Sequence, residues 1–323
     1  MTYSDNPQLS HIAQRLAADN PAVRRVAIMD LAEVSDEPGA EQLFLQALAD
    51  PVAEVRAEAA KVIDEFPPET ITDALIKALT APDNTLRACA ARALADLKDP
   101  ETGAALLQAL ELGDDPFVLE AVLHALKNLQ YAPALDAGLR LAFHAEPSVR
   151  REAVGLLGYL RHQPSMQVIG ERALTDTHAE VRRQAVAALV GGESAIVGSY
   201  VSQALKDENW QVRAEVAGVL ARLRIPASLQ PLIQAAADPV WQVREKAAQA
   251  LGALGSREAI PALGRCAADP VSNLRKTAIA ALGEIGDRAA EPYLDPALED
   301  SDPDVRKIAR WALRQLRPEP RNA

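Results

Sequence analysis

The feature that most constrains the fold of this chain is a short motif that returns about every 31 residues. The motif ends in Val-Arg or Leu-Arg and carries Asp or Asn, often followed by Pro, a few residues earlier. We call its last residue the tag. The tags are Arg24, Arg56, Arg87, Glu120, Arg150, Arg182, Arg213, Arg244, Arg275 and Arg306. Such even spacing along a whole chain is typical of a solenoid, in which one supersecondary unit stacks on the next.

Each period has the pattern of two amphipathic helices. After a tag, apolar residues recur at helical spacing, as in Val243, Ala247 and Leu251. A break with Gly follows, for example at Gly255, and then a second apolar run with Pro261 near its start. No segment shows sustained alternation of period two, so we expect an all-α fold without a sheet. The expected repeats span 7–36, 37–67, 68–99, 100–131, 132–162, 163–192, 193–224, 225–255, 256–286 and 287–317, within a single solenoid over 1–323.

The motif has a physical interpretation. Its Asp or Asn is expected to cap the N-terminus of the helix that carries the tag, and Pro fixes the angle at which the chain enters that helix. The apolar residue before the tag packs into the core. The tag Arg is expected to pair with the loop Asp of its own or of an adjacent repeat, which would make a ladder of ion pairs along one edge.

Tandem helix pairs with Asp-Pro-x-x-x-Val-Arg and then Ala-x-x-Ala-Leu-Gly-x-Leu-Gly resemble HEAT repeats, and the short period is most similar to the subclass named after phycobilin lyases. The resemblance covers residues 7 to 317 and is best in the last four repeats. It implies a right-handed α-α superhelix of about ten helix pairs, whose second helices line a concave, protein-binding side. It also implies the main alternative function, a lyase or chaperone-like subunit that assists attachment of a chromophore or cofactor to a partner protein.

Charge and composition exclude several other classes. The net charge is −11 and the pI about 5.1, which argues against general affinity for nucleic acid or anionic membranes, because such binding needs a surplus of Lys and Arg. The two cysteines, Cys89 and Cys266, lie many helices apart and give no disulfide framework. The N-terminus lacks the pattern of a signal peptide, and no stretch is apolar enough for a membrane helix. We therefore expect a cytoplasmic protein.

Motifs of catalysis are absent from the sequence. It contains no Gly-rich phosphate loop, no Cys-x-x-Cys and no His-Glu-x-x-His. HEAT-like hydroxylases with two irons use His-Glu pairs, and this sequence has none. His144 and His178 lie in consecutive loops but in different registers, so solvated loop histidines are the default interpretation rather than a metal site. No catalytic, metal-binding or cofactor-binding residue is assigned, and an enzyme is the less favoured alternative.

The candidate binding surface is the stripe of each second helix opposite its core stripe, one, five and nine residues after the tag. In the middle of the chain this stripe combines small residues, including Ala121 and Ala125, with three arginines. Gly inside an exposed helix costs about 1 kcal/mol relative to Ala, and three explanations stay open: a closely approaching partner, tight helix packing, or a coding bias toward Gly and Ala. The arginines suggest an acidic partner protein. The predicted contact residues are Arg151, Gly155, Tyr159, Arg183, Ala187, Gly218 and Arg222.

Aromatic residues suggest two further features. Trp210 and Trp241 stand three residues before their tags in adjacent repeats, as Phe117 does in repeat four. They are predicted to form an aromatic recognition strip, or else to pack over the neighbouring ladder. Trp311, in the last repeat, is expected to cover the exposed end of the core.

Overall fold

The computed structural model describes residues 6–111 and 113–316. These residues form twenty α-helices, joined by turns and short 3-10 segments, and contain no strand. The helices fall into two compact units, which divide between Leu160 and Arg161. Each unit is described by itself. The division falls close to the repeat boundary expected at residues 162 and 163. A single uninterrupted solenoid stays a prediction.

Unit 1 consists of five helix pairs in the described residues. Its helices are α1 (Pro7–Leu16), α2 (Pro21–Ala32), α3 (Ala40–Leu48), α4 (Ala53–Lys61), α5 (Pro68–Ala78), α6 (Asn84–Asp96), α7 (Thr102–Ala109), α8 (Pro116–Asn128), α9 (Leu135–Leu141) and α10 (Pro147–Leu160).

Unit 2 repeats the same plan. Its helices are α11 (Ser165–Thr175), α12 (Ala179–Ala188), α13 (Ser194–Ala204), α14 (Trp210–Leu223), α15 (Leu229–Ala235), α16 (Trp241–Leu254), α17 (Ile260–Cys266), α18 (Ser272–Ile285), α19 (Glu291–Leu294) and α20 (Pro303–Leu316). In this unit 3-10 turns precede α13, α15, α17 and α19, and a further one separates α19 from α20.

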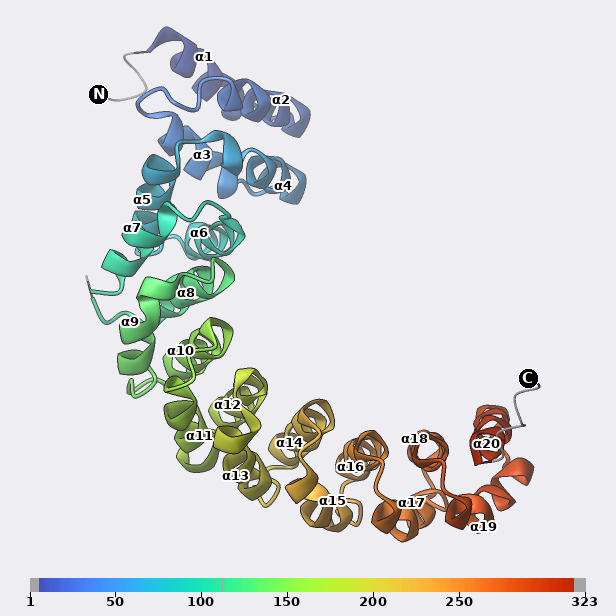
Figure 1. The fold of residues 1–323 in the computed structure, drawn as a ribbon. Coiled ribbons are helices and arrows are strands. Elements are labelled where there is room, and N and C mark those ends of the chain that lie inside the picture. Colours follow the sequence, from blue (N-terminus) through green and yellow to red (C-terminus); the bar gives the residue numbers. More distant parts are fainter. Residues whose placement is uncertain (1–5, 112, 317–323) are drawn as a thin grey trace, which may run out of the picture. The chain divides into compact units, whose positions relative to one another are not determined.

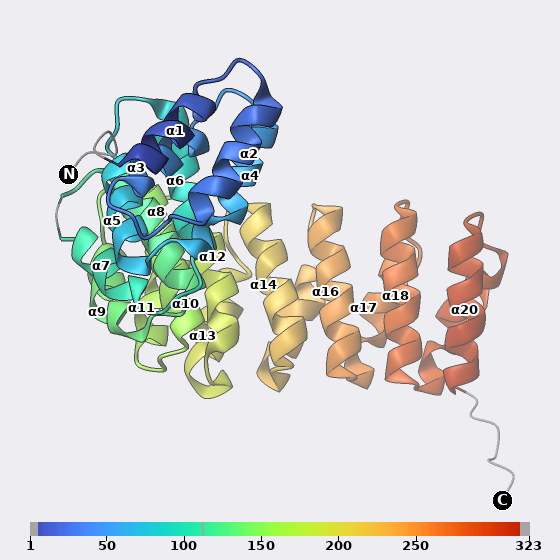
Figure 2. The same ribbon diagram turned by 90° about the horizontal axis from the view of Figure 1, so that it is seen from above.

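The helices of each unit lie in two layers. The even-numbered helices, which carry the tags, form the inner layer, and the odd-numbered helices form the outer layer (Figure 1). In unit 2, α14, α16, α18 and α20 pack side by side, each against the next (Figure 2). Within each unit the inner layer lies on the concave side, as the sequence predicted for the second helix of each pair. The all-α solenoid fold is confirmed, and none of the helices in the described part is long and apolar enough to cross a membrane.

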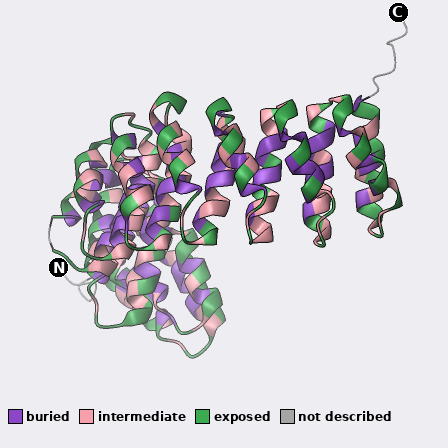
Figure 3. Cartoon of the chain, turned by 90° about the horizontal axis from the view of Figure 1, so that it is seen from below, coloured by how far each residue is buried: buried purple, intermediate pink, exposed green. Residues whose placement is uncertain are grey.

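The core forms where the helical spacing placed it. Val243, Ala247 and Leu251 are fully buried on α16, and exposed residues gather at the turns of unit 2 (Figure 3). Gly255 ends α16 with φ of 68°, in the left-handed region that favours glycine, and its N–H donates to carbonyls of the last turn. Pro261 lies in the first turn of α17, where its missing N–H costs nothing.

Most tag arginines form the expected ladder, in which the arginine pairs with the Asp of the following repeat. In the Arg213 rung, Nε lies 2.7 Å from Oδ2 of Asp238 and Nη2 lies 3.0 Å from Oδ1, while Nη1 donates to the carbonyls of Asp207 and Glu208 in its own loop. One guanidinium thus fastens two consecutive loops. In unit 2 this pairing continues through Arg182–Asp207, Arg213–Asp238, Arg244–Asp269 and Arg275–Asp300.

The motif Asp or Asn caps its helix, as expected, where it directly precedes the first helical residue. Asn20 and Asp115 directly precede α2 and α8, and each accepts a hydrogen bond from a backbone N–H of the first turn. Asn209 also caps α14 in this way, but in copies such as that of Arg244, where the Asp stands farther from the helix, the prediction is wrong. Asp238 stands three residues before α16 and accepts from the N–H of Val240, the residue that occupies the cap position. This Asx turn aims the carboxylate at the arginine of the preceding repeat rather than at the helix end.

The ladder of unit 1 has a gap that can be filled. Arg24 pairs with Asp50, but Arg56 contacts only the carbonyls of Asp50 and Pro51 and has no ion pair among the described residues. The position 25 residues after Arg56, which an Asp occupies in the rungs of unit 2, is Ala81.

We expect Ala81→Asp to raise the unfolding free energy by about 1 kcal/mol, because it supplies Arg56 with a partly shielded carboxylate. Urea unfolding followed by circular dichroism measures the change. Ala81→Asn is the matched control, since it can form the same Asx turn without a charge. Equal stability of the two variants would contradict the proposed rung.

The ladder also predicts the response of the fold to acid. The hydrogen bond from Arg275 holds the pKa of Asp300 below its ordinary value, although burial acts in the opposite direction. A lowered pKa gives stability that is present above the unfolded value of about 4 and is lost as pH falls through the folded value. We expect thermal melts to show falling stability below about pH 4. The loss should be smaller in Asp300→Asn, whose side chain does not titrate, and an identical pH dependence would contradict this assignment.

Candidate functional site

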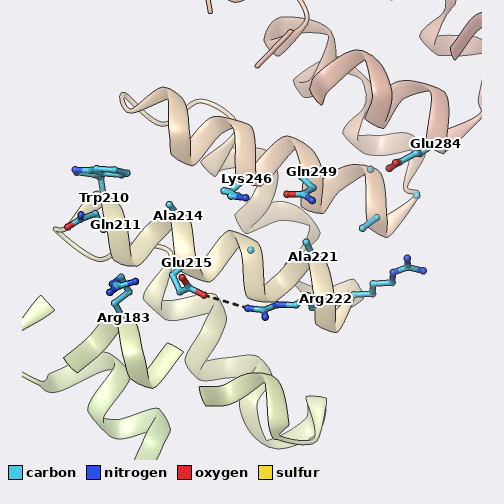
Figure 4. A pocket seen from close by; sticks show the side chains of 15 residues that line it. Arg183, Trp210, Gln211, Ala214, Glu215, Ala221, Arg222, Lys246, Gln249 and Glu284 are labelled. Atoms are coloured by element: carbon cyan, nitrogen blue, oxygen red, sulfur yellow. Dashed lines mark ion pairs between the residues drawn. The ribbon is translucent and has the colours of Figure 1, made fainter. Parts of the chain in front are cut away.

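A groove crosses the inner layer of unit 2 and encloses about 1030 Å³. Its walls come from α12, α14, α16 and α18, together with the residues that end α14 and α16 (Figure 4). The lining residues are Arg183, Trp210, Gln211, Ala214, Glu215, Gly218, Ala221, Arg222, Arg224, Lys246, Gln249, Gly252, Ala253, Gly255 and Glu284.

Small residues make the floor of the groove, and two glycines in it have different surroundings. A Cβ on Gly252 would lie 2.7 Å from the Cβ of Ala281 and 2.7 Å from Oε2 of Glu284, so this glycine is required for the close packing of α16 and α18. A Cβ on Gly218, in the middle of α14, would meet no atom within 4 Å. Packing within the protein therefore explains Gly252 but not Gly218.

The walls carry four basic side chains and two acidic ones. Nη2 of Arg183 lies 2.8 Å from Oε2 of Glu180, and Nη2 of Arg222 lies 3.5 Å from Oε1 of Glu215. Arg224 and Lys246 have no ion pair within 6–111 and 113–316. The groove thus carries a local excess of positive charge in a chain whose net charge is −11.

The two tryptophans occupy different surroundings, and the aromatic strip that they were expected to form stays a prediction. Trp210 begins α14, is 38% exposed and lines one end of the groove, near Arg183 (Figure 4). Trp241 begins α16, is only partly exposed and lies outside the groove lining. In repeat four, Cζ of Arg87 lies 4.6 Å from the centroid of the Phe117 ring. Phe117 thus packs against a residue of the ladder, which was the alternative to a recognition strip.

In unit 1 the predicted floor of small residues is wrong. Ala121, Ala125 and Gly155 are buried, because inner helices approach closely at these small residues and leave them no exposed surface. Tyr159 on α10 is 56% exposed, as the stripe predicted. Arg151 is partly exposed and contacts Glu152.

Glu152 is the centre of a charged cluster that the sequence did not suggest. Its Oε2 lies 2.9 Å from Nζ of Lys127 and 3.3 Å from Nδ1 of His124, both on α8. Burial alone would raise the pKa of Glu152, but these two neighbours outweigh it and hold the pKa below its ordinary value. The cluster ties α10 to α8, and we assign it a structural role.

Of the contact residues predicted in unit 2, Arg183, Gly218, Arg222 and Trp210 line the groove, while Ala187 is partly exposed on α12 outside it. Sequence reasoning missed Arg224 and Lys246. Lys246 stands two residues after its tag, outside the counted stripe. Arg224 ends α14 with φ of 48°, a backbone turn that no spacing rule predicted. The ring of Trp311 on α20 lies against Gly283 of α18, and its expected capping role stays a prediction.

The paired helices, the two-layered stack and the arginine ladder define an α-solenoid repeat protein with a charged inner groove. A family model for HEAT repeats matches residues 41–127, 199–281 and 267–323, which together make up more than half of the chain. The chain belongs to the HEAT-repeat family. The finer resemblance to phycobilin lyase repeats stays a prediction.

Solved structures show the same fold at low sequence identity. An engineered protein matches with a TM-score of 0.52 and 21% identity, over 95% of this chain and 98% of its own. The karyopherin Kap121p bound to the extreme C-terminus of the phosphatase Cdc14p matches with a TM-score of 0.55 and 18% identity, over 95% of this chain. Kap121p bound to Nup53p matches with a TM-score of 0.55 and 16% identity. The match spans 41% of the karyopherin chain in both cases. No curated protein sequence matches significantly.

Proposed function

We propose that this protein is a binding scaffold or accessory factor that engages a partner protein through the inner layer of unit 2. The observation that carries the proposal is the groove, in which four basic side chains face two acidic ones within an acidic chain. Two structural neighbours are complexes with protein partners, which supports a protein rather than a small-molecule ligand.

The chemistry of the groove favours a partner with an acidic contact surface. Guanidinium groups bind carboxylates through paired hydrogen bonds, and Arg224 and Lys246 form no ion pair within the described residues. Nucleic acid is the less suitable partner, because the repulsion from a chain of net charge −11 acts against phosphate binding beyond the groove. Cys89 and Cys266 are both free and buried, which suits a reducing compartment, and we propose the cytoplasm.

The test is affinity purification of the tagged protein from its source cells, with bound proteins and chromophores identified together. We expect a stoichiometric protein partner to be lost when the four groove residues Arg183, Arg222, Arg224 and Lys246 are replaced by Ala. The matched control replaces four exposed basic residues on the outer layer and turns of unit 2, namely Lys206, Arg257, Arg265 and Arg288.

The two variants remove the same positive charge, so a partner lost equally from both would reflect net charge and would contradict a role for the groove. A bound pigment that disappears with the partner would favour the alternative function, assistance of chromophore attachment.

A further inference from the structure

The central glycine of α14 distinguishes the middle of the groove from its ends. A glycine in a helix interior lowers helix stability by about 1 kcal/mol relative to Ala. This cost is offset at Gly252, where any side chain would collide with α18. At Gly218 a Cβ would have no neighbour within 4 Å, so nothing in the fold requires the absence of a side chain there.

The open position shares its groove with two basic groups that form no ion pair within the described residues. Gly218 lines the groove together with Lys246 of α16 and Arg224 at the end of α14. Arg222, on the same helix, is 56% exposed and holds Glu215 only at 3.5 Å. The surface around Gly218 therefore offers room and positive charge together.

The dimensions of the groove suit an extended segment of chain. From Trp210 to Arg222 the helix α14 rises by about 18 Å, at 1.5 Å per residue. A strand-like peptide of about five or six residues covers this length. An acidic segment of this length, laid along α14, would bring its side chains to the basic groups that line the groove.

We propose that the groove of unit 2 binds an extended acidic peptide segment of the partner, and that Gly218 is the specificity-determining residue over which this segment passes. The inference rests on the proposed function, since it identifies the kind of partner that the same groove accepts. Acidic side chains of the segment pair with Lys246, Arg222 and Arg224, and its backbone or a side chain occupies the space above Gly218.

The test uses Gly218→Leu in the full-length chain. Leu is a good helix former and meets no neighbour at its Cβ, so we expect the melting temperature to rise by about 1–4 °C. The same side chain fills the groove, so we expect affinity for an acidic peptide to fall by about tenfold or more. A variant that is more stable and binds less separates a binding role from a structural one.

Gly198→Ala is the matched control. Gly198 lies inside α13 of the outer layer, where a Cβ would make ordinary contacts of 3.6 Å and 3.8 Å with Ile225. We expect it to raise the melting temperature similarly without changing the affinity.

The probe is a phage-displayed library of random linear peptides, selected on the wild-type protein and measured afterwards by fluorescence polarisation. We expect the selected peptides to be rich in Asp and Glu, and their binding to weaken in Gly218→Leu and in Arg224→Ala/Lys246→Ala. Peptides that need Arg224 and Lys246 but tolerate Gly218→Leu would overturn this inference and leave the proposed function standing. Peptides indifferent to both variants would overturn both proposals. Selection of neutral or basic peptides, or of none, would overturn the acidic-segment inference alone.

Discussion

Asp238→Ala should destabilise unit 2 by about 3–5 kcal/mol, because it removes the partner of a shielded guanidinium and leaves the charge of Arg213 uncompensated. The side chains of Arg213 and Asp238 are 14% and 9% exposed. The carboxylate also accepts the N–H of Val240, so the turn before α16 loses its anchor in the same substitution. Urea unfolding gives the free energy, and hydrogen exchange should show the loss concentrated in α14 and α16.

Glu180→Ala is the control for this experiment. It breaks the pair of Arg183 with Glu180, whose side chains are 45% and 54% exposed, and exposed pairs contribute less than about 1 kcal/mol. Replacing both members of the buried pair, as in Arg213→Met/Asp238→Leu, should recover much of the loss. Similar losses for Asp238→Ala and Glu180→Ala would show that the ladder contributes no more than surface charge.

Gly252→Leu should lower the unfolding free energy by about 3 kcal/mol, through overpacking between α16 and α18. Even its Cβ would lie 2.7 Å from the Cβ and 2.9 Å from the Cα of Ala281, and backbone yields less readily than a flexible side chain. Gly218→Leu is the same substitution on the adjacent inner helix, and there we expect a gain of about 0.5–1 kcal/mol.

Thermal and urea unfolding of the two variants, measured side by side, test the pair. Changes of opposite sign in the unfolding free energy would show that packing requires Gly252 but does not require Gly218. A loss of stability in both would mean that Gly218 also has a packing role, and it would remove the main support for the acidic-segment proposal.

The ladder of Arg–Asp pairs is more complete in unit 2 than in unit 1. Unit 2 has a continuous series of Arg–Asp rungs. Unit 1 lacks a rung at Arg56, and Glu120 replaces the tag arginine on α8. A solenoid is stabilised mainly by contacts between neighbouring repeats. Ala81, where the partner of Arg56 is missing, is therefore a position at which one substitution can add stability.

The sequence by itself determined the secondary structure, the core and the existence of the ladder. Apolar spacing identified the buried face of α16, and the repeated Asp and Arg predicted the rungs. Both features depend on a local sequence pattern that recurs in each repeat. The sequence could not tell which loop Asp each Arg meets, since its own and the next repeat offer the same residue types.

Only the tertiary structure decided which small residues are available to a partner. Ala121, Ala125 and Gly155 stand at the same helical angles as Gly218, but the first three are buried and Gly218 faces open space. The distance between neighbouring helices sets this difference, and that distance depends on the side chains of both helices together. The sequence did not predict Lys246 and Arg224 as groove residues for the same reason. Their positions depend on how α14 ends and on how α16 packs beside it.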